Sequence, residues 1–101
     1  MGAVRVERRE SESTVVIHVV GPLCLDHCRE FRDAYRHSVC VLRFVVNLSC
    51  CEHIDSAGLG IIMLLWEYAG AEGAEVEITD APARVERSLR IAGFGTLLNT
   101  T

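Results

Sequence analysis

The sequence predicts one α/β domain, built on a mixed β-sheet of four to five strands with helices mainly on one face. Two observations predict it. The chain has 101 residues, half of them hydrophobic, which suits a single self-sufficient core. Strand-like runs alternate with helical periodicity, in the order strand, strand, helix, strand, helix, strand, helix. Since no linker or repeat divides the chain, we expect one domain over residues 1–101.

The first elements form a predicted hairpin. Residues 4–7 alternate apolar and polar side chains, as a short half-buried strand does. Residues 10–13 are polar and predict a turn. Residues 14–20 are continuous and rich in β-branched side chains, which predicts a buried strand that pairs with the first. Gly21 and Pro22 are expected to end this second strand.

Helical periodicity follows over residues 25–37. Its apolar positions recur every three or four residues, at Leu25, Cys28, Phe31 and Tyr35. Residues 42–48 are apolar and predict the next strand. Residues 57–71 read as a second helix, for which Gly73 is a suitable stop because glycine readily adopts the left-handed conformation after a helix.

The last third predicts a strand over residues 76–79 and a third helix. Pro82 favours the start of that helix, where its missing N–H costs nothing. Glu86 and Arg90 are spaced to form a surface ion pair, and Gly93 is expected to end the helix. A final edge strand is expected over residues 96–98. The apolar stripe of this helix is predicted at Val85, Leu89 and Ala92.

Composition and charge exclude several classes. The net charge is −4 and there is no lysine, whereas nucleic-acid binders usually carry a basic surplus, so no nucleic-acid partner is expected. The longest apolar run, residues 61–66, is far below the ~20 residues of a membrane span, so no membrane insertion is expected. The first residues lack the apolar core of a secretory signal, so a cytoplasmic location is expected.

Five cysteines favour reduced thiols, because an odd number without a secretory signal argues against a disulfide framework. Cys24 and Cys28 flank His27, which resembles half of a metal site. The other half would be the adjacent Cys50 and Cys51, a poor geometry for one tetrahedron. No metal is expected, and these cysteines are read as small buried hydrophobes. A thiol or metal sensor stays open as an alternative.

The most informative segment is residues 53–60, HIDSAGLG, between a strand and a helix. Asp55 or Ser56 can cap the helix by accepting bonds from its first N–H groups. Unpaired N–H groups and the positive end of the helix dipole also suit an anion, so a phosphate on Ser56 is physically tolerated there. The alternative is that the serine is only a cap.

Nucleotide and catalytic motifs are missing from the same segment. It has neither the lysine of a phosphate-binding loop nor the third glycine of a dinucleotide fingerprint. No nucleophile elbow surrounds Ser56. We therefore expect no enzyme and no cofactor.

The helix over residues 57–71 is apolar on all sides. Such a helix is either covered on both sides or offers one side to a partner. We expect one face in the core and the other as a partial docking patch, with complete burial as the alternative. The two faces are predicted to be Leu59, Ile62, Met63 and Trp66 on one side, and Ile61, Leu64, Leu65 and Tyr68 on the other.

Residues 44–98 resemble the STAS domain, the fold of bacterial anti-anti-sigma factors. The run FVVNLS resembles the strand before the family's switch loop, and residues 55–60, DSAGLG, match its D-S-[ST/A]-G-L-G pattern. Residues 72–73 before a short strand and residues 88–94, SLRIAGF, match its later motifs. The N-terminal hairpin and residues 21–23 fit more loosely, so the resemblance covers nearly the whole chain.

The resemblance implies a protein-binding switch rather than an enzyme. The unphosphorylated domain binds an anti-sigma factor that is also a serine kinase, which frees a sigma factor. The kinase phosphorylates the serine after the aspartate, here Ser56, and a phosphatase resets the domain. The chain itself then needs no cofactor. The implied partner-binding residues are Asp55, Ser56, Ala57, Gly58, Leu59, Gly60 and Met63.

One departure keeps a second function open. The chain has Gly-Pro-Leu-Cys at residues 21–24 where many active members have Gly-Glu-Leu-Asp, so an acidic pair near the switch loop is missing. STAS domains also serve as structural subunits of membrane lipid-transport complexes or as scaffolds in signalling assemblies. In that role phosphorylation is dispensable, and the apolar helix docks on another subunit.

Overall fold

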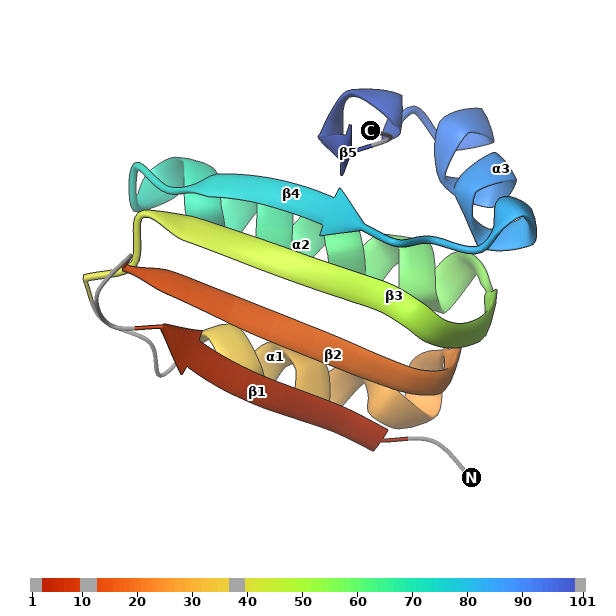
Figure 1. Cartoon of the computed structure of the whole chain (residues 1–101), viewed down its shortest axis with the longest axis horizontal. Coiled ribbons are helices and arrows are strands. Elements are labelled where there is room, and N and C mark those ends of the chain that lie inside the picture. The colour runs from red at the N-terminus through yellow and green to blue at the C-terminus, as the bar shows by residue number, and fades with distance from the viewer. Residues whose placement is uncertain (1–2, 10–12, 37–39, 100–101) are drawn as a thin grey trace.

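Five strands form one mixed sheet in the computed structural model, which describes residues 3–9, 13–36 and 40–99 (Figure 1). The strands lie in sequence order across the sheet. β1 runs antiparallel to β2, and β2, β3, β4 and β5 run parallel to one another. The predicted mixed sheet is therefore confirmed. The bounds are β1 Ala3–Arg9, β2 Thr14–Leu23, β3 Arg43–Ile54, β4 Glu75–Thr79 and β5 Leu98–Asn99.

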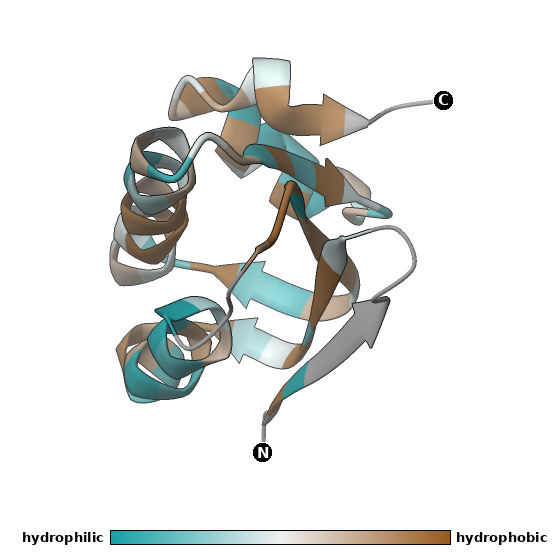
Figure 2. Ribbon diagram, turned by 90° about the vertical axis from the view of Figure 1, so that its left-hand side faces the viewer, coloured by the Kyte–Doolittle hydropathy of each residue, from teal (hydrophilic) through white to brown (hydrophobic). Residues whose placement is uncertain are grey.

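Two helices cover one face of the sheet, α1 (Cys28–Arg36) and α2 (Ser56–Ala71), as Figure 2 shows. A third, α3 (Ala83–Ile91), lies near the end of the sheet where β3 and β4 finish (Figure 1). Two 3₁₀ turns, η2 (Leu25–His27) and η3 (Gly95–Leu97), complete the described part. The prediction of helices mainly on one face is confirmed. Within the described residues no helix is long and apolar enough to cross a membrane.

The core lies between the sheet and these helices. Alternate strand residues point toward the helices, so Ile17, Phe44 and Ile78 are almost completely buried. Tyr35 of α1 and Tyr68 of α2 meet with ring centroids 5.0 Å apart, and the same Tyr68 ring lies 6.3 Å from Phe44. This aromatic contact fastens the two helices to each other and to β3.

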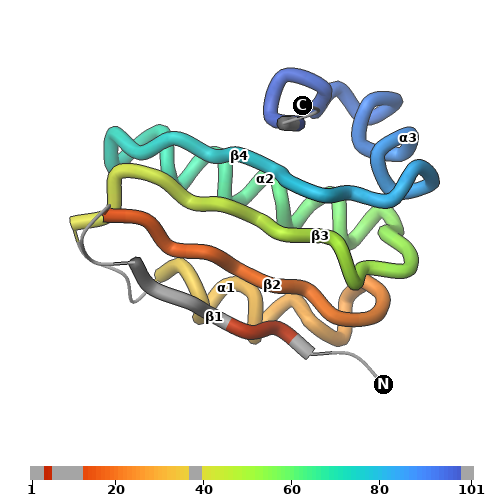
Figure 3. The backbone as a smooth tube through the Cα atoms, in the orientation of Figure 1, coloured from red at the N-terminus to blue at the C-terminus, as the bar shows by residue number. Residues whose placement is uncertain are grey.

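β2 does not end at Gly21 and Pro22 as predicted, but continues to Leu23. Its pairing with β3 shifts register between His18 and Val20 and again between Gly21 and Leu23. A proline without an N–H is tolerated at such an irregularity, so here the Gly-Pro pair bends the strand instead of stopping it. β3 follows the same bend (Figure 3) and reaches Ile54, six residues beyond its predicted end.

The first helix begins later than predicted. Leu25 to His27 form a 3₁₀ turn and the α-helix starts at Cys28, while residue 37 lies outside the described residues. Leu25 is the first residue of this turn and precedes the α-helix that carries buried Phe31. The assignment of Leu25 to the buried stripe was wrong, because its side chain is 71% exposed.

The third helix is shorter than predicted at both ends. Pro82 is its N-cap rather than a first-turn residue, and the helix ends at Ile91. Ala92 is the C-cap residue and is exposed, so its prediction as part of the apolar stripe was wrong, whereas Val85 and Leu89 are fully buried. Gly93 has a φ of +92°, which confirms it as the residue after the helix end.

Three further predictions concern the Glu86–Arg90 ion pair, the final strand and the turn at residues 10–13. The ion pair between Glu86 and Arg90 is present, with 3.3 Å between nitrogen and oxygen. The final strand is Leu98–Asn99 rather than residues 96–98, because Gly95–Leu97 form η3. Of the predicted turn at residues 10–13, residues 10–12 lie outside the described residues.

Candidate functional site

The start of α2 is fixed by Asp55. Its backbone is extended and its Oδ1 accepts a hydrogen bond from the Gly58 N–H at 2.8 Å. Its carbonyl accepts the first intrahelical bond, from the Leu59 N–H at 2.9 Å. Of the two candidates for the cap, Asp55 is therefore the N-cap residue, and Ser56 is the first residue inside the helix.

Gly58 allows the helix to lie against the end of β2. A Cβ atom at this position would collide with the Leu23 carbonyl group and come within 2.8 Å of Ile54 Cγ1. The Leu23 oxygen also accepts a hydrogen bond from the Asp55 N–H at 3.3 Å. The first turn of α2 is thus held to the carboxyl ends of both β2 and β3, and a side chain at residue 58 would separate them.

Ser56 is exposed on this fixed turn. Because the cap is made by Asp55, the fold does not require the Ser56 hydroxyl. The intrahelical pattern gives no partner to the N–H groups of Ser56 and Ala57, which lie at the positive end of a 16-residue helix dipole. The site therefore combines an accessible hydroxyl with an anion-favouring backbone, beside one acidic neighbour, Asp55.

An exposed apolar stripe runs along α2 from this turn. Met63 and Trp66 follow Ser56 at helical spacing and are 48% and 54% exposed. Leu59 lies on the same line and is half-buried, whereas Leu64 is exposed on the flank of the helix. We call Ser56, Leu59, Met63 and Trp66 the α2 stripe.

The predicted division of α2 into two apolar faces was wrong. The buried stripe draws on both predicted sets, because the surface of a helix that faces a sheet is centred between them. One side of the helix is nevertheless core and the other exposed, as expected for a helix that is not covered all round. The buried residues of α2 are Gly58, Ile61, Ile62, Leu65 and Ala69.

The residues predicted to contact a partner occupy different depths. Ser56, Gly60 and Met63 are exposed, and Asp55, Ala57 and Leu59 are half-buried. Gly58 is buried, so its role is to hold the turn against the end of β2 and not to contact a partner.

Leu25 is exposed, although it shares the apolar spacing of the predicted first helix. It follows β2, whose last residue Leu23 pairs with Ile54 immediately before the site. The sequence could have indicated that Leu25 lies near Ser56. Each follows a strand of a parallel pair, and the loops at the carboxyl ends of adjacent parallel strands lie close together.

The prediction that Cys24, Cys28, Cys50 and Cys51 are small buried residues holds for Cys51 and was wrong for the other three, of which Cys24 and Cys28 are half-buried. All five are free thiols. Cys51 is buried and its thiol lies 3.4 Å from the His53 carbonyl oxygen, while Cys50 is exposed. Burial raises the pKa of the Cys51 thiol, which disfavours the reactive thiolate. The described residues contain no group of three or more His, Cys, Asp or Glu side chains arranged to hold a metal ion.

Comparisons with known proteins agree on one family and one fold. The family model described as "Mlab, STAS domain" matches residues 6–99. A STAS-domain containing protein of Pseudomonas aeruginosa (strain UCBPP-PA14) is 32% identical over 81 residues, which are 79% of this chain and 80% of that protein.

Solved structures resemble the chain over nearly its whole length. The anti-sigma factor antagonist SpoIIAA in its unphosphorylated form superposes with a TM-score of 0.86 at 19% identity, covering 98% of this chain and 88% of that one. The Bacillus cell fate determinant SpoIIAA in its phosphorylated form superposes with a TM-score of 0.76 at 17% identity, covering 98% and 91%. At these identities the likeness concerns the fold.

Proposed function

Because the chain belongs to the STAS domain family, we propose that it is an anti-sigma factor antagonist that is switched off by phosphorylation of Ser56. The unphosphorylated protein binds a kinase-type anti-sigma factor and thereby frees a sigma factor. The observation that carries this proposal is that two different residues at the start of α2 provide the helix cap and the candidate hydroxyl. Asp55 makes the cap and leaves the Ser56 hydroxyl exposed to an enzyme.

The α2 stripe is the proposed contact surface. A kinase that places its active site over Ser56 also covers the next turns of the helix, where Met63 is exposed. Gly60 adds no bulk on this side, since a Cβ there would meet nothing within 4 Å. Exposed apolar side chains beside small residues suit close packing against a partner.

Phosphorylation supports the release step by electrostatics. A phosphoserine carries nearly two negative charges, which would lie beside Asp55 inside a closed interface. In the complex those charges lose their water, so the complex is weakened. In the free protein the N–H groups of Ser56 and Ala57 and the helix dipole favour the phosphate, so the domain stays folded.

The remaining components of the switch come from its partners. The kinase supplies ATP and magnesium, and a phosphatase removes the phosphate, so this chain acts as a binding protein without a cofactor. The cycle places the protein in the cytoplasm, with its sigma factor. In support, the SpoIIAA protein that shares this fold is described both as an anti-sigma factor antagonist and in a phosphorylated form.

A second candidate keeps the binding surface and drops the phosphorylation. The chain then serves as a scaffold or structural subunit of a membrane lipid-transport or signalling complex, docked through the α2 stripe. Two observations favour it. The matching family model is described as Mlab, and residues 21–24 lack the acidic pair that many active members carry.

Intact mass separates the two candidates. The protein is incubated with ATP, magnesium and each kinase-type anti-sigma factor of the host. A gain of one phosphate that Ser56→Ala abolishes supports the switch and identifies the partner. The absence of any phosphate with every kinase tested overturns the switch in favour of the scaffold.

A further inference from the structure

β5 covers only part of the β4 edge. The register pairs Ile78 with Leu98 and Thr79 with Asn99, and the chain before β5 turns away as η3. The first three residues of β4, Glu75 to Glu77, pair with β3 on one side. On their other side no strand of the described residues pairs with them. An open strand edge is a template for another chain.

The backbone of Val76 offers a donor and an acceptor at this edge. The Glu75 N–H donates to the Leu42 carbonyl oxygen on the β3 side at 3.0 Å. Backbone groups alternate in direction along a strand of a parallel sheet, so the N–H and C=O of Val76 point to the open side. These two groups can pair with one residue of an added strand.

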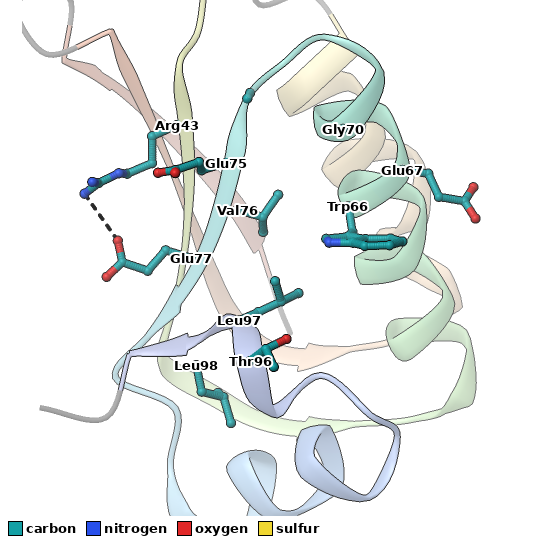
Figure 4. Close-up of a pocket in the computed structure, with 11 residues that line it drawn as sticks. Arg43, Trp66, Glu67, Gly70, Glu75, Val76, Glu77, Thr96, Leu97 and Leu98 are labelled. Carbon is teal, nitrogen blue, oxygen red and sulfur yellow. Dashed lines mark hydrogen bonds and ion pairs between the residues drawn. The ribbon is translucent and has the colours of Figure 1, made fainter.

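A groove of about 760 Å³ lies along this edge and has two different walls (Figure 4). We call it the β4-edge groove. On the side toward α2 its wall is apolar, formed by Trp66, Val76 and Leu97. On the other side of the strand it is charged, formed by Glu75, Glu77 and Arg43. A strand added here would point successive side chains to the two walls in turn.

The charged wall selects a basic side chain. This wall contains two glutamates, Glu75 and Glu77, against one arginine of the groove lining, Arg43. That arginine already lies 3.4 Å from the Glu77 carboxylate. Glu75 stays exposed beside the pair, so the wall keeps a net negative charge. An incoming arginine or lysine is attracted there, whereas an acidic residue is repelled.

We propose that the β4-edge groove binds an extended segment of a partner protein in which apolar and basic residues alternate. The segment adds as a strand to β4, in line with β5. Its apolar side chains enter between Val76 and Trp66, and its basic side chains meet Glu75 and Glu77. Strand addition takes affinity from backbone bonds and specificity from alternate side chains. The groove does not require phosphorylation of Ser56, so it serves the switch and the scaffold alike.

Trp66 provides the test, because it is the only tryptophan of the chain and forms a wall of the groove. The probe is the blocked peptide Val-Arg-Val-Arg-Val, and Val-Glu-Val-Glu-Val is its matched control. Titration of the full-length protein with the basic peptide is expected to shift the tryptophan emission to the blue and to saturate. The acidic peptide is expected to bind at least about tenfold more weakly, since two attractive charge contacts become repulsive.

Charge reversal on the protein completes the test. The variant with Glu75→Lys and Glu77→Lys should reverse the preference between the two peptides, and Glu75→Lys alone should reduce it if the double variant fails to fold. Glu30→Lys on α1, outside the groove lining, is the matched control and should change nothing. Circular dichroism checks each fold.

Backbone pairing is tested separately with a Val-Arg-Val-Arg-Val peptide that is N-methylated at alternate residues. Loss of its binding supports strand addition. Three results overturn the proposal: no emission shift with the basic peptide, equal binding of the basic and acidic peptides, or undiminished binding after N-methylation.

Discussion

The backbone of Gly58 lies directly against the carbonyl oxygen of Leu23, with no room for a side chain between them. This contact joins the first turn of α2 to the end of β2. It fixes where Ser56 emerges, because Ser56 is two residues earlier on the same turn. The glycine at residue 58 and the serine at residue 56 are thus parts of one arrangement.

Gly58→Ala is expected to destabilise the fold, because the new methyl group must push the Leu23 carbonyl away. Overpacking of this kind costs about 1–3 kcal/mol of unfolding free energy. Urea unfolding followed by circular dichroism measures it. Gly60→Ala is the matched variant: its Cβ meets nothing within 4 Å, so helix propensity should stabilise the protein by about 0.5–1 kcal/mol. Equal effects at the two glycines would contradict the role given to the Leu23 contact.

Replacing Asp55 separates its cap from its charge. Asp55→Ala removes the acceptor for the Gly58 N–H and should cost about 1 kcal/mol of unfolding free energy, measured by urea unfolding. Asp55→Asn keeps an acceptor and should cost little, because asparagine caps as well as aspartate does. Any change of phosphorylation rate in the asparagine variant then reports the charge next to Ser56. A large loss of stability in Asp55→Asn would rule out this separation.

Ser56→Ala should leave the unfolding free energy within about 0.5 kcal/mol of wild type, because the serine side chain is exposed and Asp55 makes the cap. It should abolish the mass gain with the kinase. Ser56→Glu should weaken binding of the anti-sigma factor at least about tenfold in a calorimetric titration, since a charge enters the interface. Unchanged affinity of the glutamate variant would count against the switch and for the scaffold.

Met63→Arg and Leu65→Arg test the two sides of α2. Met63 is 48% exposed, so its arginine variant should fold normally and lose partner binding. Leu65 is fully buried, and an unpaired arginine there should unfold the domain. Circular dichroism and a pull-down distinguish the outcomes. Normal binding by a folded Met63→Arg variant would exclude the α2 stripe as the contact surface.

Alkaline pH is expected to weaken the fold through Cys51. Burial raises the pKa of this thiol above its ordinary value of 9.0, so folding favours the neutral form. Its contribution to stability is complete below pH 9 and is lost as the pH rises through the folded-state value. Burial also raises the pKa of Tyr35 above its ordinary value of 10.0, so its contribution to stability is likewise lost only at a still higher pH. Urea unfolding between pH 7 and about 10 should show the decline, and Cys51→Ala should reduce it.

Local patterns in the sequence were enough to predict most of the secondary structure and to locate the candidate site at residues 55–60. Alternation over residues 4–7 and helical spacing from Cys28 to Tyr35 identify secondary structure because period 2 and period 3.6 are properties of the chain itself. The run from Asp55 to Gly60 identified the start of α2, since caps are local. Ser56 became the candidate serine because this run resembles the switch-loop pattern of STAS domains. The glycine stops at residues 73 and 93 have positive φ angles, which glycine adopts without the steric cost of a Cβ atom.

The tertiary structure decided which side chains are buried and which strand edges are paired. Which side of α2 is buried depends on the sheet beneath it, and no periodicity reveals that for a helix that is apolar all round. The passage of β2 through Pro22 depends on bulged pairing with β3, a partner that lies about thirty residues away in the chain. The open edge of β4 exists because β5 pairs with two of its residues, and this register is fixed only when both strands are packed. Burial and pairing are long-range effects, and local sequence cannot express them.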